Sequence, residues 1–308
     1  MIKRRMTRNC APSIAFLALT LVLLLCNGAL CADQLEASRA VSQPVGVRQP
    51  RHDWNVQLNT IYLAPGNLSS MDADSSISDT RLRLTRNFRW DTATTLTIGG
   101  GYGIKHIDAP SSAKLPQDLH ALSLETGLNY RINPRSFINL KIFPGLYSDF
   151  NEVGNNDIRM PLLALGGYSF ENGVQVVGGF LYRVGYHSAP FLPILGLSYQ
   201  PVPEWRIDLV MPRPGVTYIP SQQLRLFVAG DFTGDEYQIH DATVEADALK
   251  YRDLRIMGGF DYLPKPGITC SAAVGYAFDR SFEFYDSARN SLRINDVPFV
   301  KLSLDIGW

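Results

Sequence analysis

The sequence predicts an all-β fold: an antiparallel transmembrane β-barrel of about 12–14 strands, with short periplasmic turns and longer external loops. Three observations predict it. Segments of alternating hydrophobicity recur along the chain, short and long connections alternate between them, and the last segment ends on an aromatic residue. A soluble exported β-sandwich that binds a ligand would explain the first observation but neither of the other two.

The amino terminus has the order of a cleaved secretory signal. Basic residues between Lys3 and Arg8 precede an apolar run from Ile14 to Leu25, and small residues around Gly28 to Ala32 precede the first acidic residue, Asp33. The apolar run is too short to span a bilayer as a helix. We therefore expect residues 1–32 to be removed on export.

The remaining chain divides into a leader and one domain. Residues 33–52 are polar, contain two prolines and are predicted to form a flexible periplasmic leader, and residues 53–308 are predicted to form the barrel. Without residues 1–32 the chain carries 25 basic and 29 acidic residues, a net charge of −4, so nothing favours a nucleic-acid partner. Cys270 is then the only thiol, which excludes an internal disulfide and a cysteine metal cluster, and we expect no cofactor or metal.

Fourteen segments alternate between apolar and polar residues, beginning with 54–63, where Trp54, Val56 and Leu58 share a face. An even number is what a single-chain bacterial barrel requires. Segments 204–211 and 215–219 are shorter than the about 9–11 residues of a spanning strand, and without them the count is twelve. The other segments, in order, are 80–90, 93–104, 119–132, 136–147, 158–170, 173–186, 192–200, 223–232, 251–263, 268–279 and 297–308.

The connections carry independent information. Short ones fall at 91–92, 133–135, 171–173, 201–203, 220–222 and 264–267, and longer ones at 64–79, 105–118, 148–157, 187–191, 233–250 and 280–296. The two kinds alternate, with the brief 212–214 link as the exception. Short turns on one side of a membrane and long loops on the other are typical of outer-membrane barrels, whereas a sandwich has no reason to sort its loops.

The closing segment is the strongest single signal. Val300, Leu302 and Leu304 alternate with Lys301 and Ser303, and the chain ends at Trp308. This strand resembles the carboxyl-terminal signal strand of bacterial outer-membrane proteins, which implies the barrel assembly machinery as a partner. The four tryptophans, on this topology, all lie at the periplasmic rim and are predicted to form one aromatic girdle: Trp54, Trp90, Trp205 and Trp308.

The polar faces of the segments are charged and face the predicted lumen. Charges there either line a pore and set its field, or pair across a narrow lumen and hold the wall together, because an unpaired buried charge is costly. Arg81, Arg83 and Arg89 lie on one strand and are the best pore-lining candidates, since few residues could neutralise all three. The remaining pore-lining candidates are Glu125, Asp208, Asp261 and Asp305.

A surface hydrolase is the alternative function, with a histidine-based site in the external loops. The candidates are His106 with Asp108, His187 with Ser188, and His240 with Asp241. Adjacent residues on a strand point to opposite faces, which makes the last two pairs poor, and we predict no enzymatic activity.

The segment PFLPILGLSYQPVPEWRIDLVMPRP, from Pro190 to Pro214, resembles a family of bacterial outer-membrane β-barrel proteins of unknown function, and later pieces such as YRDLRIMGGFDY at 251–262 support it. The resemblance implies fold and location only. We therefore expect a monomer in outer-membrane lipids. Its function is expected to be a passive channel for small solutes or a structural barrel with a charged lumen.

Overall fold

A computed structural model describes residues 52–69, 71, 73–188 and 190–308. The predicted signal peptide and all of the predicted leader except His52 lie outside these residues. Within them, sixteen strands form one sheet, with three short 3-10 helices between them. The strands are β1 (Trp54–Asn67), β2 (Asp74–Arg89), β3 (Thr94–Asp108), β4 (Asp118–Asn133), β5 (Ser136–Ile142), β6 (Gly145–Ser148), β7 (Ile158–Ser169), β8 (Val174–Val184), β9 (Phe191–Val202), β10 (Trp205–Val210), β11 (Gly215–Tyr218), β12 (Leu224–Gln238), β13 (Ala248–Lys265), β14 (Ile268–Tyr285), β15 (Leu292–Ile294) and β16 (Val297–Gly307).

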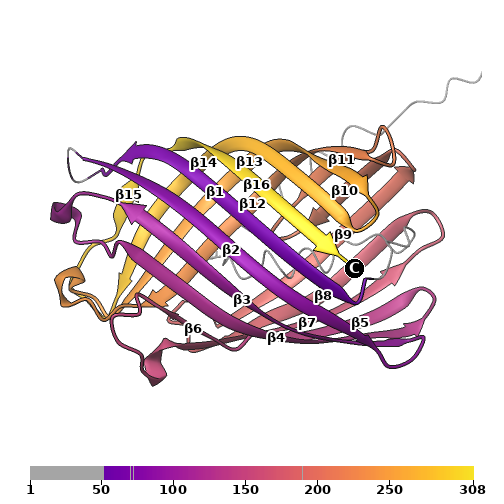
Figure 1. Ribbon diagram of the computed structural model, residues 1–308, viewed down its shortest axis with the longest axis horizontal. Coiled ribbons are helices and arrows are strands. Elements are labelled where there is room, and N and C mark those ends of the chain that lie inside the picture. The colour runs from indigo at the N-terminus through magenta and orange to yellow at the C-terminus, as the bar shows by residue number, and fades with distance from the viewer. Residues whose placement is uncertain (1–51, 70, 72, 189) are drawn as a thin grey trace, which may run out of the picture.

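The sheet closes into an antiparallel barrel (Figure 1). Strand β1 pairs with β16, and β11 pairs with β12, so that the ring has no free end. Strands β5 and β6 share one place between β4 and β7, and β15 is a side branch on β14, which leaves fourteen places around the ring. The barrel prediction is confirmed at the upper strand number, and the β-sandwich alternative is wrong because the described strands form one closed sheet.

Both short segments belong to the ring. Strand β10 has six residues and pairs with β9 and β11, and β11 has four residues and pairs with β12. Their hairpin is much shorter than its neighbours and ends part of the way along the wall. The link between them, residues 211–214, is held by a hydrogen bond from Gly230 N to Pro214 O of 2.7 Å.

The two ends of the barrel differ as the loop pattern predicts. At one end, which we call the turn end, connections of two to five residues join the strands, and the described chain both begins and ends there. At the other end, the loop end, the connections are longer except at 211–214. No helix in the described part of the chain has the length and apolarity needed to cross a bilayer.

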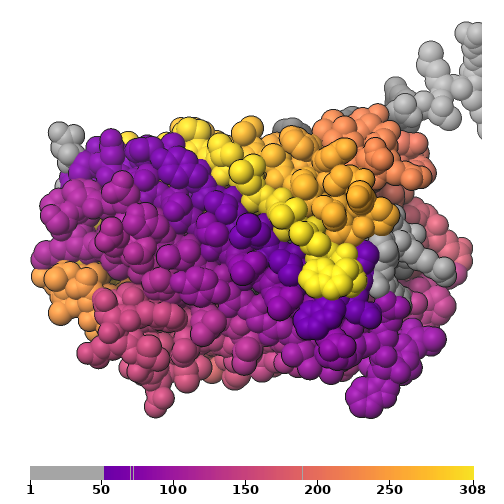
Figure 2. Space-filling model, in the orientation of Figure 1, coloured from indigo at the N-terminus to yellow at the C-terminus, as the bar shows by residue number. Residues whose placement is uncertain are grey.

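The outer surface of the wall is apolar. On β16, Val300, Leu302 and Leu304 are 47%, 56% and 37% exposed, whereas Phe299 and Lys301, which alternate with them, are buried. The same alternation leaves leucine, tyrosine, phenylalanine and valine side chains exposed on the other long strands. Figure 2 shows this wall from outside, with the yellow last strand beside the indigo first strand. A continuous apolar exterior on a closed barrel is the surface that hydrocarbon solvates.

The loop-end parts of β12 and β13 leave the wall and cross the interior; residues 231–253 are called the inner hairpin. Strand β12 stands opposite β4 in the ring, yet Gln238 at its end pairs with Ser148 of β6. From Gly230 onward nearly every residue of β12 is buried, on whichever face of the strand it lies. The sequence predicted 233–250 as an external loop, and this is wrong, because much of it is strand inside the barrel.

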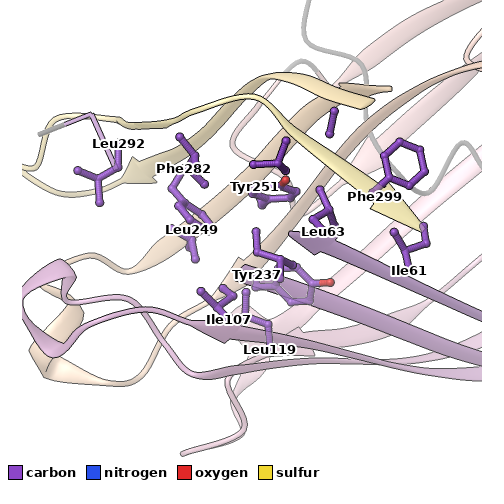
Figure 3. Close-up of a cluster of buried hydrophobic side chains, with 14 of the residues drawn as sticks. Ile61, Leu63, Ile107, Leu119, Tyr237, Leu249, Tyr251, Phe282, Leu292 and Phe299 are labelled. Carbon is purple, nitrogen blue, oxygen red and sulfur yellow. The ribbon is translucent and has the colours of Figure 1, made fainter. Parts of the chain in front are cut away.

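The inner hairpin builds an apolar core in the loop-end half of the barrel (Figure 3). Tyr237 and Leu249 from the hairpin face Leu63, Ile107 and Leu119 from the inner side of the wall. A second buried cluster lies inside β5 and β7–β10, around Leu163, Leu181 and Ile194. The interior of this barrel is therefore packed at the loop end like the core of a soluble protein.

Candidate functional site

Four charged residues tie the inner hairpin to the opposite wall. Asp235 of β12 lies 2.6 Å from Arg81 of β2 and 2.9 Å from Lys105 of β3. Asp79 accepts from the same two cations at 3.0 and 2.8 Å. The cluster has two positive and two negative charges, and three of its four side chains are almost fully buried. Here the predicted pore-lining Arg81 is paired across the lumen.

The other two predicted pore-lining arginines of β2, Arg83 and Arg89, also have carboxylate partners. Arg83 donates to Glu125 of β4, with Nε at 2.7 Å, and Lys141 of β5 donates to the same carboxylate at 3.0 Å. Arg89 lies at the turn end, where it is 3.3 Å from Asp53 and both side chains are exposed. The expectation that few residues could neutralise the three arginines is wrong, because each meets a different carboxylate.

Two further charge groups line the middle of the lumen. Arg255 of β13 donates to Asp253 at 2.7 Å, and Asp253 also accepts from Tyr251 at 2.8 Å. Lys301 of β16 lies 3.9 Å from Asp231, where β12 leaves the wall. Both Asp231 and Lys301 are almost fully buried.

Among the described residues, two cavities of interest lie in the lumen along the barrel axis. The smaller, of about 100 Å³, lies beside the Arg81 cluster and is lined by residues of β1–β4, the inner hairpin and Lys301. The larger, of about 640 Å³, lies toward the turn end between β9–β14 and β16, and Lys301 lines it as well. Lys301 and its neighbour Asp231 therefore mark the boundary between the two cavities.

The turn-end cavity contains two of the predicted pore-lining carboxylates. Asp208 of β10 accepts from Arg206 at 2.9 Å and from Ser198 at 2.6 Å. Asp261 of β13 accepts from Ser271 at 2.6 Å. Asp305, the third predicted carboxylate in this half, accepts from the amides of two β1 residues, Asn55 and Gln57, at 2.6 Å each.

The loops interlock above the inner hairpin. Arg289, between β14 and β15, donates to the backbone oxygens of Ala113, Lys114 and Val244. Lys114 also donates to the Glu245 carboxylate at 2.5 Å, and this hydrogen bond lowers the pKa of that exposed carboxyl group. The loop end is therefore covered by connections that bind one another as well as the hairpin.

All four tryptophans lie at the turn end. Trp54 and Trp308 exchange backbone hydrogen bonds of 3.0 and 3.1 Å, and their rings stack at 6.5 Å. Trp205 packs against Tyr218 at 4.8 Å, and Trp90 is 83% exposed just beyond the end of β2. The four therefore lie at one rim of the barrel, and their role as an interfacial girdle stays a prediction.

The three candidate histidines have hydrogen-bond partners other than those expected. His106 lies 2.7 Å from Asp118 instead of Asp108, and His240 lies 2.7 Å from Asp157 instead of Asp241. His187 Nδ1 is 2.8 Å from the buried carboxylate of Glu236 on the inner hairpin.

Ser188 does not form a nucleophile–base pair with His187. Its Oγ donates to the same Glu236 carboxylate at 3.2 Å, and no hydrogen bond joins it to the imidazole among the described contacts. Glu236 therefore fastens the β8–β9 loop to the inner hairpin. In the described residues there is also no group of three or more His, Cys, Asp or Glu able to hold a metal ion.

The sequence pattern did not indicate the three residues that form an ion cluster with Arg81. Predicted strands began at residue 80 and ended at residues 104 and 232, so Asp79, Lys105 and Asp235 fell just outside them. A signal for Asp79 was present, because it continues the alternation of Arg81 and Arg83 by one more step. Asp235 had no such signal, since the surrounding stretch is polar on both faces.

The fold and the charged lumen define the class of protein: a single-chain transmembrane β-barrel with an obstructed interior. Within that class, the chain belongs to the family described as a domain of unknown function (DUF6268), whose family model matches residues 81–293. The match begins well before Pro190, the first residue of the segment that carries the resemblance in the sequence.

The similarity of this chain to solved structures is one of fold alone. No curated protein matches the chain. It is similar to an outer-membrane channel from Pseudomonas putida F1, at 15% identity over 85% of this chain and 100% of that one, with a TM-score of 0.49. It is also similar to a deletion mutant of the TodX monoaromatic hydrocarbon channel, at 11% identity over 87% and 93% of the chains and a TM-score of 0.48. The translocator domain of the autotransporter NalP from Neisseria meningitidis is 12% identical over 90% and 96%, with a TM-score of 0.40.

Proposed function

We propose that this protein is a passive outer-membrane channel for small solutes, with a lumen that the inner hairpin obstructs at the loop end. The turn end faces the periplasm and the loop end faces the exterior. The observation that carries the proposal is the pair of charged cavities in series, of about 640 and 100 Å³, which share Lys301 as a lining residue. A barrel with a purely structural role has no need of a cavity large enough for a small molecule.

The obstruction lies beyond the smaller cavity. Tyr237 and Leu249 pack against the inner wall there, and Asp235 is bonded to Arg81 and Lys105. A solute that reaches the smaller cavity therefore passes only when the hairpin shifts from the wall. We therefore expect the conductance of the wild-type protein to be low and intermittent.

Planar bilayer recordings test the proposal. In the test variant, residues 236–250 are replaced by Asn-Gly, which joins the paired residues Asp235 and Tyr251 by a two-residue turn. This change keeps the central ion cluster and removes the part of the hairpin that packs in the loop-end core. We expect a conductance several-fold above that of the wild type and open most of the time.

The control deletes Glu152 and Val153, two exposed residues of another loop-end connection. This control is expected to conduct like the wild type. Folded protein is identified by its faster migration on gels before heating than after. A folded test variant that conducts no more than the wild type contradicts the channel and favours a structural barrel.

The proposed location has its own tests. We propose export through a signal cleaved after residue 32, insertion by the barrel assembly machinery and a monomeric state in outer-membrane lipids. Amino-terminal sequencing of the protein from a Gram-negative host, and its recovery in the outer-membrane fraction as a single-chain species, are the expected results. Recovery in a detergent-free soluble fraction contradicts the location.

A further inference from the structure

The turn-end cavity has the size of a ligand site. Its volume of about 640 Å³ falls within the range of roughly 300–1,000 Å³ that small-molecule sites occupy. Hydroxyl and amide groups line it together with apolar side chains, among them Ile219, Phe227 and Ala273. Such a mixed lining suits a solute that has both a polar group and an apolar body.

The cavity has an excess of positive charge. Four basic residues line it, Arg206, Arg213, Arg225 and Lys301, against the two carboxylates of Asp208 and Asp261. Arg206 is paired with Asp208, and Lys301 lies 3.9 Å from the buried Asp231. Arg213 and Arg225 then remain against Asp261, which leaves the lining with one excess positive charge.

Neither of these two arginines has a carboxylate partner among the described residues. In the described part of the chain, the guanidinium of Arg213 donates one side-chain hydrogen bond, to the sulfur of Met257 at 3.9 Å. Arg225 stands opposite Asp261 in the β12–β13 register, but no nitrogen–oxygen contact of 4.0 Å or less joins them. A guanidinium in a confined lumen is stabilised when an anion binds it, and its planar donors match a carboxylate.

The short hairpin β10–β11 places Arg213 in the lumen. Because β10 ends at Val210, the link 211–214 turns toward the interior, where Arg213 N donates to Val210 O at 3.1 Å and Pro212 is buried. Met257, against which the guanidinium lies, is itself a buried residue on the inner face of β13. A hairpin that spanned the full wall would carry this position toward the loop end.

We propose that the turn-end cavity binds a small organic anion, a carboxylate with an apolar body, and that Arg213 and Arg225 match its charge. This inference rests on the proposed function for its consequence, since such anions are then the class of solute that the channel admits. The binding itself requires no open path through the barrel.

Fluorine NMR of 4-fluorobenzoate added to the mature protein in nanodiscs tests the proposal. The neutral analogue 4-fluorobenzamide has nearly the same shape and no charge. We expect 4-fluorobenzoate to bind about tenfold or more tightly than the amide, because the charged hydrogen bonds are lost with the charge. Equal affinity for the two probes overturns the proposal on the wild-type protein alone.

Variants assign the site. Arg213→Gln and Arg225→Gln are each expected to weaken 4-fluorobenzoate binding about tenfold, while Arg213→Lys keeps most of it through the retained charge. The control is Arg293→Gln, an exposed arginine at the loop end, which is expected to bind like the wild type. Folded glutamine variants with wild-type affinity overturn the assignment.

The binding and conductance measurements together distinguish a failure of the anion site from a failure of the proposed channel. If the protein binds 4-fluorobenzoate more tightly than 4-fluorobenzamide but does not conduct, even with the shortened hairpin, the channel is contradicted and the anion site is supported. Conductance with equal binding of the two probes supports the channel and overturns the anion site.

Discussion

Asp235 is the residue that ties the inner hairpin most directly to the wall. Its carboxylate lies between Arg81 and Lys105, and its side chain is 5% exposed. Without it, these two cations share the single carboxylate of Asp79. Removing one partner from a buried ion cluster leaves charge uncompensated, at a cost of about 3–5 kcal/mol.

We therefore expect Asp235→Ala to lower the free energy of unfolding by about 3–5 kcal/mol. Urea unfolding in detergent micelles, followed by tryptophan fluorescence, measures this. Asp118→Ala is the matched control, because the Asp118–His106 pair is a carboxylate contact of 2.7 Å with both side chains more than 40% exposed. The control is expected to change the free energy by less than about 1 kcal/mol. Equal losses in the two variants would contradict a special role for the buried cluster.

The strands were predictable wherever one face meets lipid and the other meets the lumen. Strand β16 shows this, since Leu302 and Lys301 alternate as their surroundings do. The inner hairpin is buried on both faces inside a charged interior, so polar residues such as Asp235 and Gln238 occupy both sides and the alternation disappears. The single predicted strand 136–147 is divided for a different reason: two residues, Phe143 and Pro144, separate β5 from β6.

Two adjacent glycines of β8 differ in the space around them, and the sequence alone does not show this difference. A Cβ on Gly179 would lie 2.0 Å from the backbone oxygen of Ala164 on β7, whereas a Cβ on Gly178 would meet only Leu195, at an ordinary 3.6 Å. Close approach of the two backbones thus requires a glycine at residue 179.

We expect Gly179→Ala to force β7 and β8 apart and to destabilise the folded barrel by about 1–3 kcal/mol, as overpacking does in protein cores. Gly178→Ala is expected to have almost no effect. The fraction of protein that migrates as the folded form on unheated gels, measured against urea concentration, gives both values. Equal sensitivity of the two positions would show that β8 does not need the close contact.

At the scale of the whole molecule, the barrel is closed by its two ends. Trp54 and Trp308 bond through their backbones and stack through their rings where β1 meets β16. These contacts join residues from the beginning and the end of the described chain. They form only when all the strands between them are in register.

Trp308→Ala is therefore expected to slow assembly and to lower the yield of folded protein several-fold. The control is Trp90→Ala, because Trp90 lies on the same rim, is 83% exposed and has no ring partner among the described residues. Refolding into liposomes, followed by the gel shift on heating, measures the rate for each. Similar rates for the two variants would mean that the rim position matters and the closure contact does not.

The closed wall and its two distinct ends could be predicted from the sequence, because they follow from the alternation of apolar and polar residues and from loop length. The interior could not be predicted in this way. Which carboxylate meets Arg81, or that His187 and Ser188 both bind Glu236, depends on a hairpin that folds across the lumen. Contacts of that kind join residues far apart in the chain, and no local pattern records them.

The inner hairpin consists of the loop-end parts of β12 and β13, two strands of the wall, and this limits how the proposed channel can open. Strands β12 and β13 run without a break from the turn end into the loop-end core. A separate plug domain could leave the lumen as a unit. Here the inner hairpin and the wall belong to the same pair of hydrogen-bonded strands. Widening of the proposed channel would therefore require β12 and β13 to bend together near Gly230, where they leave the wall.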